Sequence, residues 1–348
     1  MSQVRPTVRA SFFDTSSLPT DEMRDAMRAA ELGDDVYRTD PTVAALERRA
    51  AELFEREAAL FVPSGTMANL IAILVHANRG DAVVVEAGSH IAIAETGGLA
   101  AVAGCMPIPV EAPRGTITAA LLADAVLPED QHRPRPTLVC VENTHNRAGG
   151  TVTRPETMGE LAAACHERGL KLHVDGARIF NGAVALGVPV AGLAAGADSV
   201  TFALSKGLSC PVGSVLIGSA GFVHEAQRAR KLLGGAMRQA GVLAAAGIVA
   251  LESGVERLAD DHRRARELAE RLDALPELSV DVAAVETNIV VCDVSGTGRD
   301  ARTVAGELEQ AGIECAPRPP SALRFVTHRG IGDDEVDLLV AAFAQLAR

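Results

Sequence analysis

The chain has 348 residues, of which 48% are hydrophobic and 22% are charged, and this composition predicts a folded globular protein with room for two domains. A net charge of -12 at pH 7 argues against nucleic-acid binding, which needs basic stripes on the surface. The six cysteines are scattered without a C-x-x-C pair, so they indicate reduced core residues rather than a zinc site or a disulfide framework.

The N-terminal part of the sequence predicts an arm followed by two helices. Residues 1–18 lack strong periodicity and show no cleavable leader, and no apolar run in the chain approaches membrane length, so we expect a cytoplasmic protein. Thr20 is a plausible cap for the first helix, and the second is expected over 42–56. The polar segment between them holds Tyr37, the only tyrosine, which could pack at an interface or touch a ligand.

A short apolar strand at 59–62 leads into Ser64, Gly65 and Thr66, which open the next helix. The backbone N–H groups of such a helix start, with hydroxyls beside them, can bind a phosphate, although the same residues also suit an ordinary cap. This loop has no lysine, which excludes a Walker A motif, and nowhere does G-x-G-x-x-G follow a strand. Nucleoside triphosphate and dinucleotide binding are therefore poorly supported.

Further short apolar runs predict six more strands, at 81–86, 106–110, 137–142, 171–175, 199–204 and 213–217. They alternate with helical stretches such as 155–168, which indicates α/β layers with a mostly parallel sheet. His90, Asn143, Asp175 and Lys206 all stand at the trailing ends of strands. In such folds this edge of the sheet lines the ligand crevice.

Lys206 has the most informative position of any charged residue in the chain. Only three lysines, Lys171, Lys206 and Lys231, occur among the 33 basic residues, so arginine supplies most of the positive surface charge. A lysine kept at the end of a buried strand in such a chain is expected to be functional. A solvated surface role remains open for Lys171.

From about Gly241 the pattern changes to long helical stretches with fewer strands. A helix-rich passage is followed by a strand at 287–293, a helix near 300–310, a strand at 323–327 and a last helix from Asp333. The chain therefore predicts three parts, which are an arm at 1–18, a large cofactor-binding domain at 19–240 and a small α+β domain at 241–348.

A lysine, an aspartate and a phosphate site on one sheet edge suggest pyridoxal phosphate as the cofactor. Lys206 would supply the amine for a Schiff base, Asp175 would keep the pyridine nitrogen protonated, and the helix start would hold the phosphate. His90 could stack on the ring, whereas loop or capping roles are expected for His145 and His173. The order of these parts along the chain matches aminotransferase-like pyridoxal phosphate enzymes.

Nine runs of sequence resemble the L-threonine aldolase (β-eliminating lyase) family in more detail. They are GDDVY from Gly33, DPT from Asp40, PSGTMANL from Pro63, ENTHNRAGG from Glu142, HVDGARIFN from His173, LSKGLSCPVGS from Leu204, GGAMRQAG from Gly234, VETN from Val285 and FVTH from Phe325. The resemblance covers nearly the whole chain. It implies a fold-type-I α/β protein with a mostly parallel seven-stranded sheet between helices, a smaller C-terminal α+β domain, pyridoxal phosphate and no metal.

The resemblance implies cleavage of β-hydroxy-α-amino acids such as L-threonine or L-allo-threonine to glycine and an aldehyde. Lys206 would carry the cofactor, Asp175 would pair with the ring nitrogen, and Arg178 would contact the ring hydroxyl or the substrate. Arg324 would hold the substrate carboxylate with its two-pronged guanidinium. The residues implied for the phosphate are Gly65, Thr66 and Ser205.

The same resemblance assigns His90 and His132 to the β-hydroxyl of the substrate, directly or through water, and leaves open which group is the general base. Tyr37, Lys231 and Arg238 would reach the cofactor site of a neighbouring subunit, because this family shares sites across a dimer interface. A homo-oligomer, either a dimer or a tetramer, is therefore expected.

Three positions depart from the family pattern. Phe13 stands where a serine usually helps to hold the carboxylate, Ala94 replaces an aromatic residue, and Arg38 replaces a residue that is usually glycine. If Phe13 and Ala94 line the pocket, threonine should bind more weakly and bulkier or aryl substrates should gain. The alternative places Phe13 in a subunit interface and a neighbouring side chain beside Ala94, which would leave selectivity unchanged.

Two other functions remain open at this stage. One is a pyridoxal phosphate enzyme that performs β-elimination, racemisation or transfer on another amino acid. The other is a non-catalytic member that binds the cofactor or a protein partner. The presence of Lys206, Asp175 and Arg324 together argues against a non-catalytic role.

Overall fold

A seven-stranded sheet forms the larger part of the computed structural model, which describes residues 7–128 and 130–346. Its strands are β2 (Ala58–Val62), β3 (Ala82–Glu86), β4 (Met106–Val110), β5 (Pro136–Glu142), β6 (Lys171–Asp175), β7 (Ser199–Ala203) and β8 (Ser214–Gly218). The strand order is β2-β8-β7-β6-β5-β3-β4, and β8 pairs antiparallel with both β2 and β7. The pairs from β7 through to β4 are parallel, so the expected mostly parallel seven-stranded sheet is confirmed.

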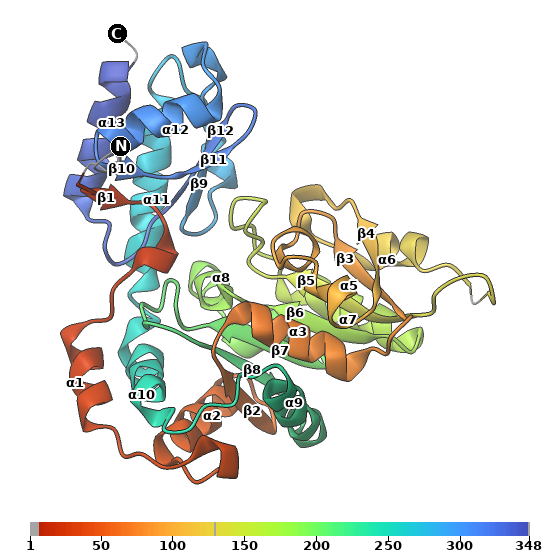
Figure 1. The fold of residues 1–348 in the computed structure, drawn as a ribbon. Coiled ribbons are helices and arrows are strands. Elements are labelled where there is room, and N and C mark those ends of the chain that lie inside the picture. The colour runs from red at the N-terminus through yellow and green to blue at the C-terminus, as the bar shows by residue number, and fades with distance from the viewer. Residues whose placement is uncertain (1–6, 129, 347–348) are drawn as a thin grey trace, which may run out of the picture.

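Helices cover both faces of this sheet (Figure 1). The helices of this part of the chain are α1 (Asp21–Ala29), α2 (Pro41–Leu53), α3 (Gly65–His76), α4 (His90–Ile93), α5 (Gly98–Ala101), α6 (Ala119–Ala125), α7 (Pro155–Glu167), α8 (Ile179–Leu186), α9 (Ala220–Leu232) and α10 (Gly241–Val249). Helix α1 packs against α10, which in turn packs against α2. Because both faces are covered, every residue of β3, β7 and β8 is buried, which explains their continuous apolar sequences. The expected cap Thr20 accepts a hydrogen bond from the backbone N–H of Met23 at 3.2 Å.

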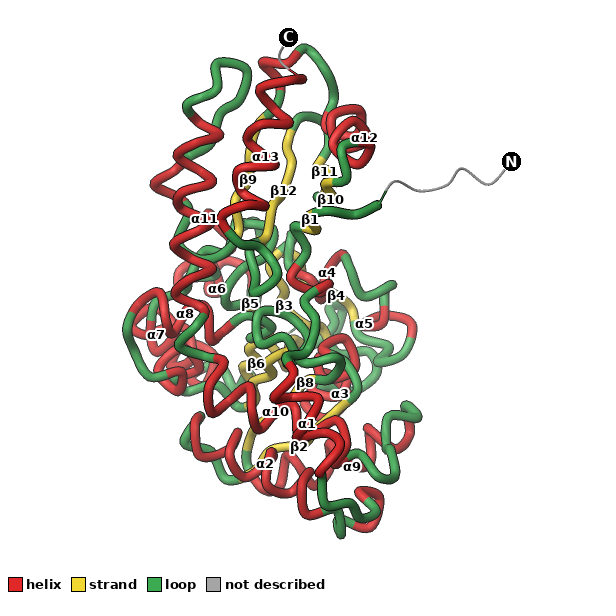
Figure 2. The backbone as a smooth tube through the Cα atoms, turned by 90° about the vertical axis from the view of Figure 1, so that its left-hand side faces the viewer, coloured by secondary structure: helices red, strands yellow, loops and turns green. Residues whose placement is uncertain are grey.

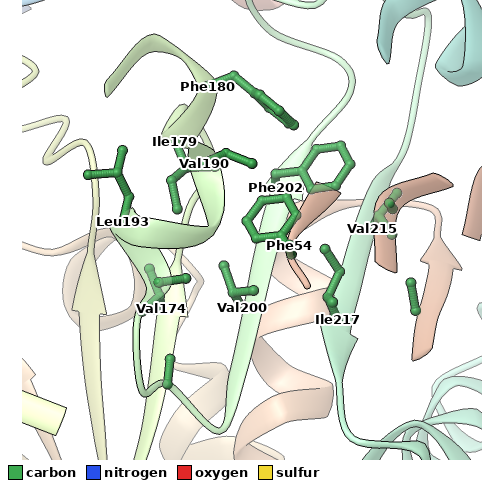
Figure 3. Packing of buried hydrophobic residues seen from close by; sticks show 14 of the residues in the cluster. Phe54, Val174, Ile179, Phe180, Val190, Leu193, Val200, Phe202, Val215 and Ile217 are labelled. Carbon is green, nitrogen blue, oxygen red and sulfur yellow. The ribbon is translucent and has the colours of Figure 1, made fainter. Parts of the chain in front are cut away.

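Three phenylalanines fix the central strand β7 (Figure 3). Phe202 of β7 stacks on Phe54, with the ring centroids 5.7 Å apart, and meets Phe180 of α8 edge-on at 5.1 Å. Val200 and Ile217 extend this apolar layer along the sheet. This packing holds the end of β7 firmly, and the turn that carries Lys206 follows it directly.

A second, three-stranded antiparallel sheet forms the C-terminal part, in the order β11-β12-β9. Its elements are β9 (Ile289–Asp293), β11 (Ala316–Arg318), β12 (Ala322–Val326), α11 (Leu258–Asp273), α12 (Ala301–Gln310) and α13 (Asp333–Leu346). Figure 2 shows this sheet and its helices at one end of the molecule and the large sheet with its helices at the other. Helix α11 contacts both β9 and α8, so it connects the two parts.

The N-terminal segment belongs structurally to this C-terminal part. Strand β1 (Ala10–Ser11) pairs in parallel with β10 (Ile313–Glu314), and the two lie side by side in Figures 1 and 2. Phe12 is fully buried and meets Phe325 edge-on, with the centroids 5.5 Å apart. The segment without periodicity is therefore anchored at residues 10–12 by one short strand and one aromatic side chain.

All six cysteines are buried with free thiols. None of the helices within the described residues is both long and apolar enough to cross a membrane.

Arg38 occupies a backbone conformation that explains why glycine is usual at this position. Its φ of 60° and ψ of 30° lie in the left-handed region, just after the 3-10 turn η2 (Asp35–Tyr37). Arg38 forms ion pairs with Asp35 and with the buried Glu47, whose Oε1 also accepts the backbone N–H of Phe61 at 2.9 Å. The ion pair between Arg38 and the buried Glu47, which helps to hold β2, therefore offsets part of the strain in the Arg38 backbone.

We predict that Arg38→Ala lowers the free energy of unfolding, because alanine keeps the left-handed strain and leaves Glu47 without its guanidinium. Arg38→Gly should be more stable than Arg38→Ala by about 1 kcal/mol. Glycine removes the left-handed strain, although its more flexible unfolded chain loses more entropy on folding. Urea unfolding of the three proteins measures the difference. A glycine variant no more stable than the alanine variant would show that backbone strain does not matter here.

Candidate active site

Lys206 lies in the turn after β7, at the edge where the parallel strands β6 and β7 end. Its backbone carbonyl accepts hydrogen bonds from the Ser17 hydroxyl at 2.9 Å and from the Ser209 N–H at 2.8 Å, which fix the turn. Burial and the positive charge of Arg178 lower the pKa of Lys206 from its ordinary value. More of the amine is then unprotonated and nucleophilic near neutral pH.

Asp175 is the last residue of β6 and is held by two hydrogen bonds. Its Oδ1 accepts the N–H of Ala177 at 3.1 Å, and its Oδ2 accepts Nδ2 of Asn69 at 2.8 Å. The N–H of Gly176 bonds the carbonyl of Thr201 in β7 at 2.9 Å. A Cβ atom on Gly176 would lie 2.5 Å from that carbonyl oxygen, so only glycine lets the chain after Asp175 approach β7 so closely.

His90, the first residue of α4 after β3, belongs to the same polar network. Its Nδ1 lies 2.8 Å from Oε1 of Glu95, and that oxygen also accepts Nδ2 of Asn69 at 2.8 Å. The hydrogen bond to Glu95 raises the pKa of His90 despite partial burial, and burial raises the pKa of Glu95. His90, Glu95, Asn69 and Asp175 thus form one connected cluster.

Among the described residues, His90, Glu95 and Asp175 also offer ligand atoms within 4.8 Å of one another, a spacing that a metal ion could use. Two of these groups already share the hydrogen bond between His90 and Glu95, and Asn69 donates to both carboxylates. A cation would have to displace these hydrogen bonds, so the donor set fits a hydrogen-bonded acid-base cluster better than a metal centre.

Arg178, which follows the turn after β6, forms a buried two-point ion pair with Asp14. Its Nε and Nη2 donate to the two carboxylate oxygens at 2.5 and 2.7 Å, and both side chains are almost inaccessible to solvent. Burial acts to raise the pKa of Asp14, but the charge and hydrogen bonds of Arg178 bring it below its ordinary value. Asp14 therefore stays ionised and fixes Arg178 beside Lys206 and Asp175.

Two arginines from the C-terminal sheet reach the loop that follows β5. Arg324 of β12 donates from Nη1 to Oδ1 of Asn146, and its buried Nε has no partner among the described residues. Arg318 of β11 donates to the backbone carbonyls of Asn146 and Arg147 at 2.8 and 2.7 Å. Burial, together with the charge of Arg324, lowers the pKa of Arg318 to about 10. This concentration of positive charge suits a carboxylate ligand.

The start of α3 forms a cluster of hydrogen-bond donors. Ser64 is the cap and accepts the Met67 N–H at 3.2 Å, and the N–H groups of Gly65 and Thr66 lie in the first turn, where a helix offers no acceptor. Ser214, at the start of β8, has a buried hydroxyl without a partner in the described part of the chain, and a Cβ on Gly65 would lie 3.5 Å from it. Ser205 is half-buried next to Lys206. This donor set fits a phosphate.

His132 does not lie at this edge of the sheet, and Tyr37 and Lys231 are exposed to solvent. His132 is exposed and precedes β5, whereas Lys206 follows β7, and parallel strands place these two positions at opposite edges. Tyr37 is 73% exposed, and the guanidinium carbon of Arg238 lies 6.0 Å from its ring centroid. Lys231 is also exposed, at the end of α9.

The two departures expected to reshape the pocket lie at the surface of the single chain. Phe13 is half-buried in a hollow that it shares with residues of α12 such as Arg302 and Glu309, so its ring faces that helix. Ala94 follows α4 and is exposed. The effect of Phe13 and Ala94 on substrate selectivity therefore stays a prediction.

The other two histidines of the motifs are buried. Nε2 of His145 lies 2.7 Å from Oε2 of Glu86, and its Nδ1 accepts the N–H of Ala148 at 3.1 Å, which agrees with the expected capping role. For His173 the expected loop or capping role is wrong, because it lies inside β6 and contacts Asn69.

Asp14, Asn69, Glu95 and Asn146 are site residues that are not expected from the sequence. One local signal was available for Asn69, because it is a polar residue in an otherwise apolar helix, where an amide needs a buried partner. Asp14 has no comparable signal, since its partner Arg178 lies 164 positions away in the sequence.

Comparison with known proteins agrees with the motifs. The model of the β-eliminating lyase family matches residues 13–295. The chain is 43% identical over 340 residues to low-specificity L-threonine aldolase 1 of Arabidopsis thaliana, covering 95% of this chain and 94% of the relative. It is 42% identical over 337 residues to the low specificity L-threonine aldolase of Escherichia coli K12, covering 96% of this chain and 98% of the relative.

Solved structures share the fold. A threonine aldolase of Leishmania major superimposes with a TM-score of 0.84 at 23% sequence identity, covering 97% of this chain and 100% of that one. A serine palmitoyltransferase of Sphingomonas wittichii superimposes with a TM-score of 0.77 at 19% identity, covering 99% of this chain and 87% of that one. At these identities the likeness establishes the fold.

We predict that Asp14→Asn lowers the free energy of unfolding at pH 7 by about 3–5 kcal/mol, because Arg178 would be left buried without a counter-charge. The folded-state pKa of Asp14 is depressed, so its contribution is present above the unfolded-state pKa and is lost as pH falls through the folded one. The difference in free energy of unfolding between the wild-type protein and Asp14→Asn should therefore become smaller below about pH 4.

Urea unfolding of both proteins at pH 7 and pH 3.5 tests this prediction. Asp25→Asn is a matched control, because Asp25 pairs with Arg28 on the open surface and its loss should change stability little. A gap that stays constant with pH would contradict the ion-pair assignment.

Proposed function

This chain belongs to the β-eliminating lyase family, and from that membership we propose that it is a pyridoxal phosphate-dependent aldolase. It would cleave β-hydroxy-α-amino acids, L-threonine and L-allo-threonine among them, to glycine and an aldehyde. The observation that carries this proposal is the grouping of Lys206, Asp175 and His90 at one sheet edge, with Arg324 and Arg178 beside them.

The residues at this edge fit pyridoxal phosphate. The unpaired hydroxyl of Ser214 and the free first-turn N–H groups of α3 suit its phosphate, and an ionised carboxylate suits its ring nitrogen. When bound, this cofactor supplies an electron-accepting ring for the charge left on Cα as the Cα–Cβ bond breaks. The residues proposed to hold it are Lys206 as the covalent link, Asp175 at the ring nitrogen, His90 at the ring face, Arg178 at the ring hydroxyl, and Gly65, Thr66 and Ser205 at the phosphate.

Arg324 is proposed to bind the substrate carboxylate. Asn146 accepts from one of its guanidinium nitrogens, which leaves the unpartnered Nε and the other terminal nitrogen for a ligand. Arg318 donates to the backbone carbonyls of Asn146 and Arg147 and so keeps Asn146 in place. In this proposal residues 19–240 form the cofactor-binding domain, and residues 241–348 form the domain that supplies Arg324.

His90 is proposed to take the proton from the β-hydroxyl. Its Nδ1 faces Glu95, so the N–H lies there and Nε2 of the neutral ring is the free acceptor. Glu95 also stabilises the cation that forms when Nε2 gains a proton, which agrees with the raised pKa of His90. Lys206, with its lowered pKa, can exchange with the substrate amine, and Arg324 holds the substrate still while the bond breaks.

We predict that the purified protein takes up pyridoxal phosphate, becomes yellow and releases an aldehyde and glycine from L-threonine, L-allo-threonine or L-phenylserine. Lys206→Ala should lose the visible absorbance of the lysine-linked cofactor and nearly all aldehyde release. Lys171→Ala is the matched control, because Lys171 is exposed and pairs with Asp198 at the opposite edge of the sheet.

The products decide between reaction classes. Ammonia and a keto acid in place of glycine and an aldehyde would support β-elimination. A wild-type protein that binds no pyridoxal phosphate would refute the proposal altogether.

We also propose that the chain acts as a homo-oligomer with shared active sites. Tyr37 is exposed yet pre-positioned beside Arg238, which is itself paired with Asp34 at 2.9 Å. The connection between α6 and β5, which carries His132, extends away from the rest of the chain (Figure 1). Because His132 lies at the edge opposite Lys206, it could serve this reaction only at the site of another copy.

We predict that His132→Asn lowers aldehyde release and that mixing subunits restores it. In a co-expressed mixture, a Lys206→Ala subunit still carries His132 and can lend it to the intact Lys206 site of a His132→Asn subunit. Aldehyde release should then exceed the sum of the two separate variants. Full activity of His132→Asn alone, or no gain in the mixture, would contradict a shared site.

A further inference from the structure

Asn69 connects the two carboxylates of the site, and no role in the reaction has been given to it above. It lies on α3, five residues after the cap Ser64, and is 1% exposed. Its Nδ2 donates to Oδ2 of Asp175 and to Oε1 of Glu95, each at 2.8 Å. Its Oδ1 lies 3.1 Å from Nε2 of His173. A single buried amide thus contacts three ionisable side chains, Asp175 and His173 of β6 and Glu95 after α4.

The positions of the protons follow from this arrangement. Both amide N–H groups of Asn69 are used by carboxylates, so its oxygen must accept, and Nε2 of His173 must carry the proton. Nδ1 of His173 then accepts from the Ser199 hydroxyl at 2.9 Å, and the oxygen of Ser199 accepts from Nε2 of His76 at 2.9 Å. Burial lowers the pKa of His173 to about 3 and that of His76 to about 4, so both rings are neutral, as this pattern requires.

The two carboxylates oppose each other electrostatically. Glu95 is buried, and the nearby charge of Asp175 adds to the effect of burial in raising the pKa of Glu95, while the hydrogen bonds from His90 and Asn69 act against it. Without the amide, the carboxyl group of Glu95 would take up a proton more easily. The titratable groups around the amide, from each segment packed there, are Asp175 and His173 of β6, His90 and Glu95 at α4, Cys140 of β5, His76 of α3 and Lys206 after β7.

We infer that Asn69 is a positioning residue whose two N–H groups hold the carboxylates of Asp175 and Glu95, Asp175 for the ring nitrogen of the cofactor and Glu95 behind His90. This inference rests on the proposed function. Asn69 would link the protonation of His90 to that of the cofactor ring, because Glu95 beside His90 and Asp175 at the ring nitrogen accept from the same amide group. Hydrogen bonds to charged groups in a buried site are the strong ones, so their loss should be measurable.

The test uses the holoenzyme and follows its visible absorbance as a function of pH. Asn69→Leu has a similar volume but no donors, so Asp175 should lose the hydrogen bond that orients its carboxylate and hold the ring nitrogen less firmly in its protonated form. Less positive charge on the ring raises the pKa of any other protonated nitrogen joined to it. The pH midpoint of the absorbance change should therefore rise by about one to two units, the size expected for one charge-assisted hydrogen bond.

Ser199→Ala is the matched control, because it breaks the same chain of hydrogen bonds beyond His173 and leaves both N–H groups of Asn69 on the carboxylates. It should lower the thermal unfolding temperature without moving the midpoint. Asn69→Ser, which is too short to reach both carboxylates, serves as a second variant if Asn69→Leu does not fold, and should move the midpoint in the same direction.

The outcomes separate the inference from the proposed function. If the wild-type protein shows the cofactor band and the Asn69 variants keep the wild-type midpoint, Asn69 has a structural role only and the inference is wrong. An equal shift in Ser199→Ala would also overturn it, because the midpoint would then not depend on the carboxylate contacts. Absence of the band in the wild-type protein would instead refute the proposed function.

Discussion

The buried ion pair between Asp14 and Arg178 joins the parts of the molecule on which the site depends. Asp14 follows β1, which pairs with β10, and the neighbouring Phe12 packs on Phe325, next to Arg324. Arg178 follows the turn that begins with Asp175. The pair therefore fixes the C-terminal sheet, through the N-terminal segment, relative to the large sheet. A buried ion pair of this kind contributes little to the net free energy of folding. Breaking it leaves an uncompensated buried charge, so the pair favours the one arrangement of the two sheets in which both charges meet.

Charge and burial act against each other throughout the site. In the proposed function Lys206 must lose its proton to react, and burial beside Arg178 favours that loss, whereas Asp175 and Asp14 oppose it. Arg178 is itself paired with Asp14, which limits its effect on the lysine. Burial and the charge of Arg324 lower the pKa of Arg318, and burial and the charge of Arg178 lower the pKa of Arg324, while the carboxylate of Glu142 acts against both shifts. An anionic ligand would relieve this repulsion, which agrees with a site for an amino-acid carboxylate.

The polar cluster around Asn69 fixes the acidic and basic side chains of the site by hydrogen bonds. Asn69 donates to both Asp175 and Glu95, and Glu95 in turn is hydrogen-bonded to His90, so these side chains hold one another in place. His173 and Ser199 extend the cluster through the interior of the sheet to His76. Fully satisfied buried networks of this kind are rigid, and rigidity at this edge is what a reaction that depends on the alignment of one bond requires.

The sequence by itself determined the strands, the mostly parallel sheet and the positions of Lys206, Asp175 and His90 at strand ends, because apolar runs, caps and strand ends are local patterns along the chain. Local patterns do not record which distant side chains meet. Only the tertiary structure could pair Asp14 with Arg178, place Asn69 between two carboxylates and bring Arg318 to the loop after β5. The direction of the strands likewise decided that His132, at the start of β5, lies at the opposite edge of the sheet from Lys206. That separation follows from the parallel pairing of β5, β6 and β7. The alternation of strands and helices predicts a mostly parallel sheet, but only the structure gives the order and register of its strands.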